Sequence, residues 1–574
     1  MAIDPSVRIE HRIAALSAPA AHYADAVSYG GLYYISGVLP VDNGGALFGG
    51  DDITAQAEQV FRNIGTTLDQ VGCSFANVLK MTVFVTSIGD RAKIDAVRRA
   101  VFGATKPAST LVEIAALAVP GAKIEIEVTA ALPDWGTMMM AIGREQYVEV
   151  TTARIKTEIL DICTTCGKCA TACPMTAPAG LDAADPKALV AGVLAMLGGE
   201  EGAPDSARWV EACSSSGVCV PACDYGVDPM FMMEMGRAAM LRQRGAKQVQ
   251  SDATRAFQGM AKSVRYMSRL FLKPEVFERL DPRAGRPSEG EPSEVIFYTG
   301  CNVLRTPHIA LICLDILDLL EIRYEVMGGP SHCCGSYQML KGDVGAATGM
   351  AMNTIAKMVS AAAPEVISWC PSCKLQFSST HLPTYAAVHG EMPFDFTAFY
   401  IYLEARIEAL APFMKNPVNR RVALDERAFD PQVNAAVRRI LGLIPGLELV
   451  ELEVEHVGMM RNMIPLEGVK KLTRDAAFEA ATQAGVETLA TVYHACHREI
   501  VSYSATVSFE IVNAIELIAD SLGIAYHDSF KEFQMVQDLD QYIDERAEQI
   551  AHHRLSIDEA RTVARNEFTA HRPA

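Results

Sequence analysis

The spacing of apolar residues predicts that residues 1–137 form one compact domain of helices and strands. Apolar side chains recur every three or four residues over 54–71, as in a helix with one buried face, and a second helical stretch covers 90–102. Over 123–131 apolar and polar residues alternate, which is typical of a strand with one face in the core. The expected strands are 31–36, 78–85 and 123–131.

A different pattern begins at residue 293. An apolar run over 293–299 is typical of a buried strand, helical spacing follows over 309–320, and a second strand is expected to end at Met327. A helix over 346–362 then leads into a strand over 366–369. Because strands alternate with helices, we predict an α/β domain with a parallel sheet.

The following region looks like a copy of this α/β domain. A constant offset of 123 residues carries the sequence HCCG at 332–335 onto EHVG at 455–458, and it carries Cys373 onto Cys496. The copy is therefore predicted to be degenerate, with most of its cysteines lost. The expected fold class is α/β multidomain, with these parts: 1–137, a mainly helical cysteine-rich domain at 151–242, a helical connector at 243–292, tandem α/β domains at 293–410 and 418–535, and a charged, solvated helical tail at 536–574.

Composition excludes several classes of protein. Of the 574 residues, 50% are hydrophobic and 21% are charged, which excludes a disordered or fibrous chain. The formal net charge of −18 disfavours nucleic acid or an anionic membrane as the main partner. No segment approaches twenty uninterrupted apolar residues, and the first residues lack the apolar core of a signal peptide. We therefore expect a cytoplasmic protein without a transmembrane segment.

Cysteine is the residue type that indicates chemistry, since fourteen of the fifteen cysteines follow residue 160. Clustered thiols in a reducing compartment bind metal more often than they form disulfides. The first group is C-x2-C-x2-C-x3-C-P, a spacing with which a loop holds one 4Fe-4S cluster and turns its last cysteine toward a second. Zinc is the alternative, but it usually needs two CxxC pairs with a longer loop between them. The four cysteines are Cys163, Cys166, Cys169 and Cys173.

A second motif has the same spacing with two changes, because Ser216 replaces a cysteine and Asp224 replaces the proline. In the two-cluster exchange pattern, Cys223 completes the first cluster, with Cys163, Cys166 and Cys169. Serine oxygen is a harder and weaker ligand for iron than thiolate, so the second site is expected to hold a three-iron cluster or a four-iron cluster with a labile corner. Loss of the second cluster is the alternative. The expected ligands of the second site are Cys173, Cys213, Ser216 and Cys219.

A third group lies at strand ends of the first α/β domain, where ligands gather in such folds. Its spacing is C-x31-CC-x35-C-x2-C, and its members are Cys301, Cys333, Cys334, Cys370 and Cys373. A metal cluster is the preferred interpretation, and structural thiols are the alternative. In the degenerate copy, four residues are candidates for a different metal or haem site or are remnants in a packed core: His456, His494, Cys496 and His497.

Residues 1–137 resemble the RidA family. The resemblance rests on Ser36-Gly37, Asn63-Ile64, the strand at 78–85, Pro107-Ala108 and the segment 123–127. It implies an α+β fold that forms trimers, with clefts between subunits where many members hydrolyse imines or enamines.

Tyr23, Ser36, Gly37 and Glu125 stand where the RidA family places cleft residues. Ser109 stands at the position where the family has an arginine that binds the substrate carboxylate. The cleft therefore lacks a guanidinium group that could bind a carboxylate through two hydrogen bonds. Arg98 and Lys106 are near in sequence and are not expected to be geometric equivalents. We expect an oligomerising role, or a retained binding or hydrolytic cleft.

Residues 151–535 resemble iron–sulfur subunits with CCG domains, as found in heterodisulfide reductase, glycolate oxidase, anaerobic glycerol-3-phosphate dehydrogenase and dimethylglycine dehydrogenase complexes. The CCG resemblance implies a non-cubane cluster at the third cysteine group, or a smaller cluster or zinc. The chain has no GxGxxG motif opening a βαβ unit, no nucleophile elbow and no P-loop.

We therefore expect a non-catalytic electron-transfer subunit with two cubane-type clusters, one 4Fe-4S and the other 4Fe-4S or 3Fe-4S. Its expected partners are a flavin-bearing dehydrogenase and an electron-transfer flavoprotein or quinone-linked acceptor. Because flavin-dependent amine oxidation produces imines, an N-methylated or secondary amine is favoured as the substrate. The alternatives are a hydroxy acid, glycerol 3-phosphate, a catalyst like heterodisulfide reductase, or a metal-dependent scaffold.

Overall fold

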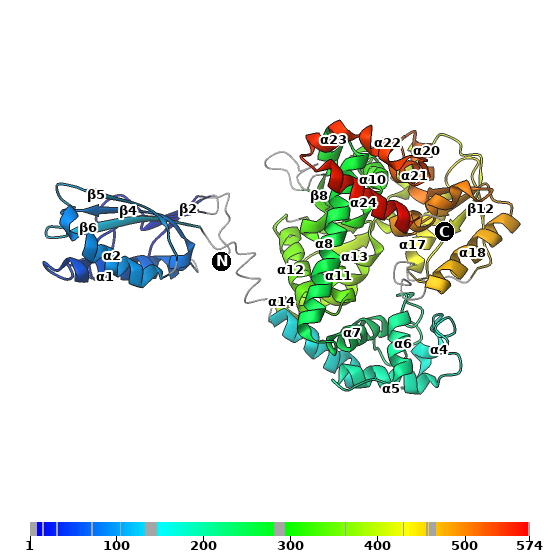
Figure 1. Cartoon of the computed structure of the whole chain (residues 1–574), viewed down its shortest axis with the longest axis horizontal. Helices are drawn as coiled ribbons and strands as arrows, with labels where there is room; N and C mark the ends of the chain where they lie inside the picture. The colour runs from blue at the N-terminus through cyan, green and yellow to red at the C-terminus, as the bar shows by residue number, and fades with distance from the viewer. Residues whose placement is uncertain are drawn as a thin grey trace. The chain divides into compact units, whose positions relative to one another are not determined.

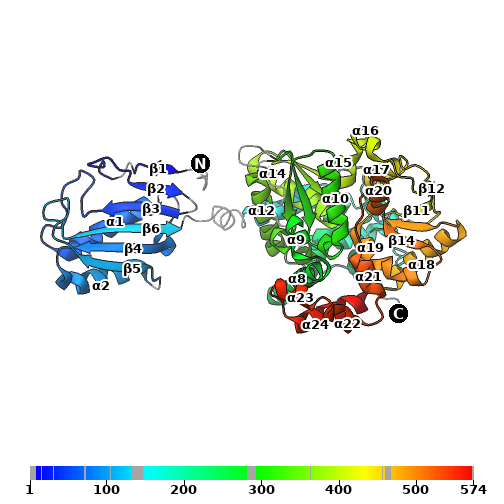
Figure 2. The same cartoon turned by 90° about the horizontal axis from the view of Figure 1, so that it is seen from above.

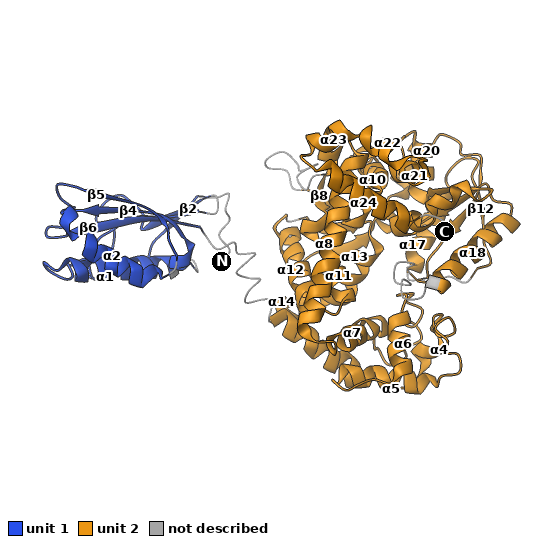
Figure 3. Ribbon diagram, in the orientation of Figure 1, with its two compact units in different colours: residues 1–143 blue, residues 144–574 orange. Residues whose placement is uncertain are grey.

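The computed structural model describes residues 8–13, 16–29, 32–69, 73–103, 105–131, 146–280, 293–361, 363–428, 430–454, 457–458 and 467–571. The chain divides into two compact units, residues 1–143 and 144–574 (Figure 3). Among the described residues, no helix combines the length and the apolar character needed to cross a membrane.

The first unit is a six-stranded sheet with two helices on one face (Figures 1 and 2). The strand order is β1-β2-β3-β6-β4-β5, in which only β4 and β5 are parallel to each other. The apolar positions of the first predicted helix, among them Val60, Ile64 and Leu68, are fully buried against the sheet. The elements are β1 (Ile9–His11), β2 (Ala26–Tyr29), β3 (Leu32–Val38), α1 (Ile53–Asp69), β4 (Val78–Val85), α2 (Arg91–Phe102), β5 (Ala108–Glu113) and β6 (Ile124–Ala131).

The second unit begins with a small helical bundle that carries the first two cysteine motifs. Two of its helices start at an Asp-Pro pair, in which the aspartate caps the helix and proline occupies the first helical position: Asp185 before α5 and Asp228 before α7. Trp209 is buried in the core between these helices. The elements are a π-helical segment (Ile155–Leu160), α4 (Lys168–Thr171), α5 (Pro186–Leu197), α6 (Pro204–Ala212) and α7 (Pro229–Arg242).

Two four-stranded parallel sheets follow, and they have the same topology. The order is β8-β7-β9-β10 in the first and β12-β11-β13-β14 in the second, so that each copy places its second strand at one edge and its fourth at the other. The strands of the first copy are β7 (Val295–Gly300), β8 (Tyr324–Gly328), β9 (Glu365–Ser368) and β10 (Asp395–Ala398). Those of the second are β11 (Arg421–Asp425), β12 (Glu448–Val450), β13 (Thr488–Thr491) and β14 (Glu510–Asn513).

The distance in sequence between the two copies is not constant. Equivalent register positions lie 123 residues apart in the third strands, Glu365 and Thr488, but 127 apart in the first strands, Val295 and Val422. The second copy therefore has four fewer residues between its first and third strands, 66 against 70, so that a constant offset of 123 misaligns the first strands. As a consequence Gly300 and Cys301 correspond to Arg427 and Ala428.

The C-terminal helices are docked on the second unit, whereas the sequence predicted a solvated tail. Helix α24 (Ile557–Ala570) packs along the long helix α8 (Ala246–Phe271), as Figure 1 shows. Its Glu567 is buried between Arg305, at 2.9 Å, and Arg498, at 3.2 Å. Burial alone would raise the pKa of Glu567, but the two guanidinium groups lower it to about 2. The charges of this segment therefore serve internal ion pairs rather than a solvated face alone.

Candidate metal centres

Three of the predicted cleft residues, Ser36, Gly37 and Glu125, lie where the end of β3 pairs with the start of β6. Pairing between these strands shifts between Ile35 and Val38, and this irregularity contains Ser36 and Gly37. A Cβ atom at Gly37 would lie 1.9 Å from Oε1 of Glu125, so only glycine lets that carboxylate lie against the β3 backbone. Burial and the charge of Glu127 raise the pKa of Glu125.

Ser36 lies close to Tyr23, another predicted cleft residue, whereas Ser109 lies on a different strand from Glu125. The Ser36 hydroxyl donates to the carbonyl of Ala24 at 2.7 Å, which places it beside the half-exposed Tyr23. Ser109 lies on β5, which pairs with β4 and not with β6, so one chain alone does not bring Ser109 to Glu125.

Ser109 has a neighbour that the sequence did not predict. Arg98 on α2 donates from Nη1 to the Ser109 hydroxyl at 3.1 Å, and it also pairs with Asp95 at 3.1 Å. A guanidinium group therefore lies at the serine position after all, supplied by a helix instead of the strand. Arg98 was not expected to take the place of the family's arginine; its contact with Ser109 depends on how α2 packs on the sheet, which sequence spacing does not report.

The first group of cysteines surrounds a single cavity. Cys163, Cys166, Cys169 and Cys223 all line it, and the remaining wall is largely apolar. The donors are four thiols, three from one loop and one from a motif more than fifty residues away. Four soft sulfur donors around an apolar cavity fit a 4Fe-4S cluster.

The second motif has the same backbone conformation as the first, despite its missing cysteine. In the first loop Thr165 and Gly167 have φ values of 54° and 81°, and in the second Ser215 and Gly217 have 57° and 73°. Left-handed conformations at two matching positions, one of them a non-glycine residue in each loop, indicate that the second loop keeps the turn of a cluster-binding loop. Ser216 thus occupies the place of Cys166, and it is buried.

The thiols expected at the second site are close enough to influence one another. Burial raises the pKa of Cys219, and the charges of Cys213 and Cys173 add to this. The degenerate copy covers the same loop, since a Cβ atom on Gly458 would lie 2.2 Å from the carbonyl oxygen of Ser214. Three thiols and one serine hydroxyl in a covered loop fit an iron–sulfur cluster with one weak ligand.

The five cysteines of the third group form a contiguous buried cluster at the ends of β7, β8 and β9. Side-chain interactions link Cys301 to Cys333, Cys333 to Cys334, Cys334 to Cys373 and Cys373 to Cys370. All five are at most 5% exposed. Hydrogen bonds from Cys333 and Cys373 lower the pKa of Cys334 to about 6, so the group stabilises a thiolate, which is the form that binds metal.

Gly300 makes room for this sulfur cluster, and Gly335 lets the turn after the paired cysteines pack against Ala347. A Cβ atom on Gly300, where φ is +68°, would lie 3.0 Å from Cβ of Cys370 and 3.1 Å from Sγ of Cys373. A Cβ atom on Gly335, where φ is +78°, would lie 2.4 Å from the carbonyl oxygen of Ala347. A close approach of backbone to five soft donors fits a metal cluster.

Comparison with known proteins divides the chain along the same lines. Residues 13–132 match the family model described as endoribonuclease L-PSP. The chain is 34% identical over 110 residues to the RutC family protein y4sK of Sinorhizobium fredii, covering 19% of this chain and 86% of that protein. The chain belongs to the RutC family through this domain. It is also 35% identical over 120 residues to a 2-iminobutanoate/2-iminopropanoate deaminase of Capra hircus, covering 21% of this chain and 87% of the relative.

The rest of the chain is similar to iron–sulfur proteins. Residues 162–228 match a 4Fe-4S dicluster domain, and residues 295–378 match a cysteine-rich domain. One subunit of the dihydromethanophenazine:CoB–CoM heterodisulfide reductase of Methanosarcina barkeri is 22% identical over 401 residues, which are 64% of this chain and 95% of that relative. The predicted joining of a RutC (RidA) domain to an iron–sulfur electron-transfer subunit of this kind is confirmed.

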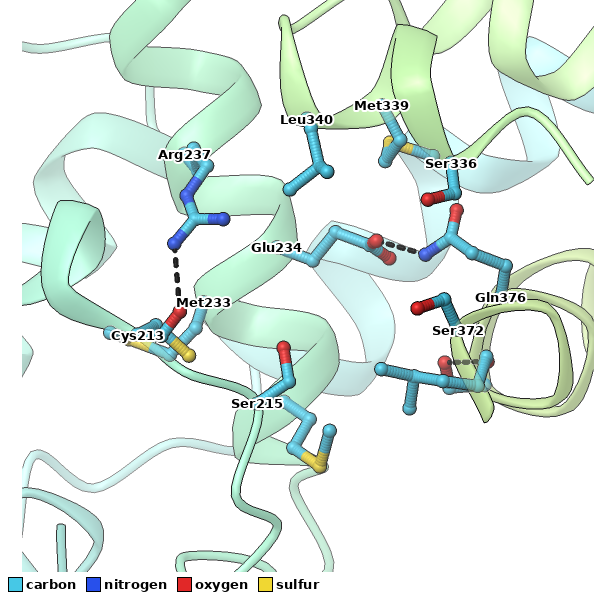
Figure 4. A pocket seen from close by; sticks show the side chains of 13 residues that line it. Cys213, Ser215, Met233, Glu234, Arg237, Ser336, Met339, Leu340, Ser372 and Gln376 are labelled. Carbon is cyan, nitrogen blue, oxygen red and sulfur yellow. Dashed lines mark hydrogen bonds between the residues drawn. The ribbon is translucent and has the colours of Figure 1, made fainter. Parts of the chain in front are cut away.

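Downstream of the RutC domain, one cavity of about 40 Å³ lies between the second and third cysteine groups (Figure 4). Cys213 and Ser215 line it from the second motif. Ser336, just after the paired cysteines, and Ser372, between Cys370 and Cys373, line it from the α/β domain. Both ligand groups therefore adjoin the same space, which has room for a few water molecules.

Helix α7 spans this cavity and contacts both of its sides. Glu234 accepts hydrogen bonds from Gln376 and, at 2.9 Å, from the Thr380 hydroxyl, both of which follow the CPSC motif. Arg237, one turn later, donates to the carbonyl of Cys213 at 3.0 Å (Figure 4). The two side chains hold the two ligand-bearing segments at a fixed separation. Neither was predicted, because no spacing rule marks them.

In the degenerate copy, an ion pair takes the place of the sulfur cluster. Arg427 donates from Nε to Sγ of Cys496 at 3.2 Å and from Nη2 to both oxygens of Asp425, at 2.8 and 2.6 Å. His497 turns to Asp528 instead, at 2.7 Å, and His494 is buried. Cys496 and His497 therefore have different partners, and His456 lies outside the described residues.

The serine of the second motif gives a direct test. Replacing Ser216 with cysteine is expected to raise the iron content by about one atom per chain, because a thiolate then completes a four-iron set. Electron paramagnetic resonance of the oxidised protein should show a three-iron signal that the S216C variant lacks. Ser214→Cys, at a buried neighbouring position equivalent to Thr164, should not change the iron content. A wild-type second cluster with four sulfur ligands from cysteine would contradict this prediction.

Proposed function

We propose that the chain is the iron–sulfur electron-transfer subunit of a flavin-dependent dehydrogenase complex. It receives electrons from a flavoprotein subunit and delivers them to an electron-transfer flavoprotein or a quinone-linked acceptor. The observation that carries this proposal is the shared cavity, since Cys213 and Ser215 on one side and Ser336 and Ser372 on the other bring two cysteine groups to adjacent positions. Adjacent redox sites in one rigid unit are what an electron-transfer subunit requires.

The protein's own contribution is ligation, burial and spacing. Iron–sulfur clusters supply one-electron chemistry when bound. The thiols of the third group are buried, which excludes water from that site, and Glu234 and Arg237 fix its position relative to the second motif. Burial and hydrogen bonds to sulfur are the means by which a protein sets a reduction potential. Gly335 contributes one such bond, from its N–H to Sγ of Cys333 at 3.4 Å.

The proposed substrate of the flavoprotein is an N-methylated or secondary amine, which loses two electrons and becomes an imine. A RutC domain in the same chain supports this choice, because one of its relatives is named as an imine deaminase. Hydrolysis of an imine needs an acid or base near the C=N bond and a water molecule. Glu125, whose pKa is raised, is the proposed acid–base residue. Arg98, which contacts Ser109, is the residue proposed to bind the carboxylate of the substrate. Since β5 and β6 are separated in one chain, two subunits of an oligomer would have to combine them.

A comparison of substrates tests this proposal. The full chain is combined with the flavoprotein that co-purifies with it, and dye reduction is measured with N-methylated amino acids, glycolate, lactate and glycerol 3-phosphate. We expect dye reduction with the amines. The Glu125→Gln variant should hydrolyse the imine product about 100-fold more slowly without any change in dye reduction. Glu58→Gln, at an exposed carboxylate on α1, is the control. Turnover only with the hydroxy compounds would exclude the amine substrate.

The similarity to a heterodisulfide reductase favours a second candidate function, reduction of a disulfide at the third cysteine group. That function predicts disulfide reduction by the chemically reduced chain without a flavoprotein. The electron-transfer proposal predicts none under these conditions.

A further inference from the structure

Four polar side chains meet in the core between the two α/β copies, away from all of the clustered cysteines. His308 comes from α10 (Pro307–Leu319) of the first copy, and three residues come from the second: His497 on α19 (His494–Ile500), Glu516 on α20 (Ala514–Leu522), and Asp528, which caps α21 (Ser529–Met535). Each places one nitrogen or oxygen atom within 4.8 Å of the other three. Helices α10 and α20 lie side by side here (Figures 1 and 2).

His308 is placed as a ligand would be placed. It is 2% exposed, and its Nε2 and Nδ1 lie 3.6 Å from Oε1 of Glu516 and 3.5 Å from Oδ1 of Asp528. These separations are too long for good hydrogen bonds, and neither ring nitrogen has a hydrogen-bond partner in the part of the chain that the structure describes. A buried imidazole without hydrogen bonds is costly unless something else satisfies it.

The spacing of these atoms matches a metal site. Zinc binds nitrogen and carboxylate oxygen at about 2.0–2.2 Å with tetrahedral geometry, which puts neighbouring ligand atoms about 3.3–3.6 Å apart. A single imidazole binds an ion through one nitrogen, so only one of the two His308 distances can apply to a given ion, and each of them, 3.6 Å from Nε2 and 3.5 Å from Nδ1, falls in that range. The hydrogen bond from His497 to Asp528 is shorter, at 2.7 Å, and an ion between these two side chains would replace it.

Both carboxylates are held in place independently of the histidines. Oδ1 of Asp528 accepts from the N–H groups of Phe530, at 3.1 Å, and Lys531, at 3.0 Å. Oε1 of Glu516 accepts from the N–H of Asn513 at 2.6 Å, in a capping box. Metal ligands are normally oriented by such secondary hydrogen bonds. The carboxylates are thus fixed before any ion arrives.

Charge also fits a divalent cation. Glu516 and Asp528 supply two carboxylates that face His308, and their side chains are 20% and 8% exposed. The amine of Lys531 is directed elsewhere, to Glu510 and to the carbonyl of Ile511. Two ionised carboxylates and two neutral imidazoles form an uncharged complex with a doubly charged ion, so that the ion would balance the carboxylates without protonated histidines.

We propose that His308, His497, Glu516 and Asp528 bind a divalent transition-metal ion that joins the two α/β copies. Zinc fits best, because the set has four protein ligands, mixes imidazole with carboxylate, and leaves no open position for a substrate. The bound ion has a structural role. Its ligands are nitrogen and oxygen atoms, whereas the three cysteine groups offer sulfur. None of the spacing rules applied to the sequence predicts it, since only His497 belongs to a recognisable cluster of candidates.

The test uses the full chain, purified anaerobically with its iron–sulfur clusters and then incubated with Zn²⁺ alone. One zinc per chain is expected, with X-ray absorption showing nitrogen or oxygen neighbours at about 2.0–2.1 Å and no sulfur at about 2.3 Å. Zinc should also raise the Tm, and a chelator should lower it without removing iron.

Variants decide whether these four residues hold the ion. His308→Gln and Glu516→Gln should each weaken zinc binding by at least about tenfold at unchanged iron content. The glutamine at position 516 still offers an oxygen to the N–H of Asn513, so the helix cap is kept. His527→Gln, at an exposed histidine beside Asp528, should bind zinc like the wild type. Zinc bound only to sulfur, no change of Tm with Zn²⁺, or full zinc binding by the E516Q variant would overturn the proposal in favour of a metal-free charge cluster.

Discussion

Replacing Cys166 with alanine is expected to remove about four iron and four sulfide atoms per chain and to reduce electron transfer by at least about 100-fold. The reason is geometric. Cys163, Cys166, Cys169 and Cys223 line one cavity, so the substitution leaves three thiols around a space that needs four. The measurements are iron and sulfide analysis of anaerobically purified protein and dye reduction in the complex with the flavoprotein.

The matched control is Cys313→Ala. Cys313 is a fully buried thiol on α10 that lies outside all three cysteine groups. This variant should lose about 1 kcal/mol of stability through the missing sulfur, and it should keep its iron and its activity. If the C166A variant retained the full iron content, the assignment of this cavity to the first cluster would be wrong.

Elements with strong local periodicity were predictable from the sequence. Helix α1 follows from apolar positions such as Val60 and Ile64, which are buried as expected, and β4 has the predicted bounds. Strand β5 was missed, because its residues are mostly exposed in the single chain and show no alternation of apolar and polar side chains. Hydrophobic patterns report burial, so they fail where a strand lies at an exposed edge.

Contacts between distant parts of the chain were not predictable. Glu567 looks solvated in a charged helix, and only packing brings it to Arg305 and Arg498. The same holds for Arg98 beside Ser109 and for Arg427, because the second copy is four residues shorter between its first and third strands and a constant offset misplaces Arg427. The cysteine groups could be found because metal ligation imposes short, regular spacings on a loop. The cavity between two of these groups needs three segments to come together, and spacing alone does not contain that information.

The third cysteine group carries the other large expected effect. Cys373 interacts with both Cys334 and Cys370, so it is the link between Cys370 and the other three sulfurs. Replacing it with alanine separates Cys370 from the other three. We expect the C373A variant to lose the iron bound at this group and to retain the iron of the helical domain, since those ligands belong to separate loops.

Electron delivery to the acceptor should fall by at least about 100-fold in the C373A variant, while reduction of the helical-domain clusters by the flavoprotein should stay at the wild-type rate. The two measurements together distinguish the third group from the first, because the C166A variant should be slow both in cluster reduction by the flavoprotein and in electron delivery to the acceptor. Ser372→Ala serves as the control within the same CPSC turn, since it changes the cavity wall without removing a thiol. If C373A delivered electrons at the wild-type rate, the third group would be a structural set of thiols, and the path through the complex would end in the helical domain.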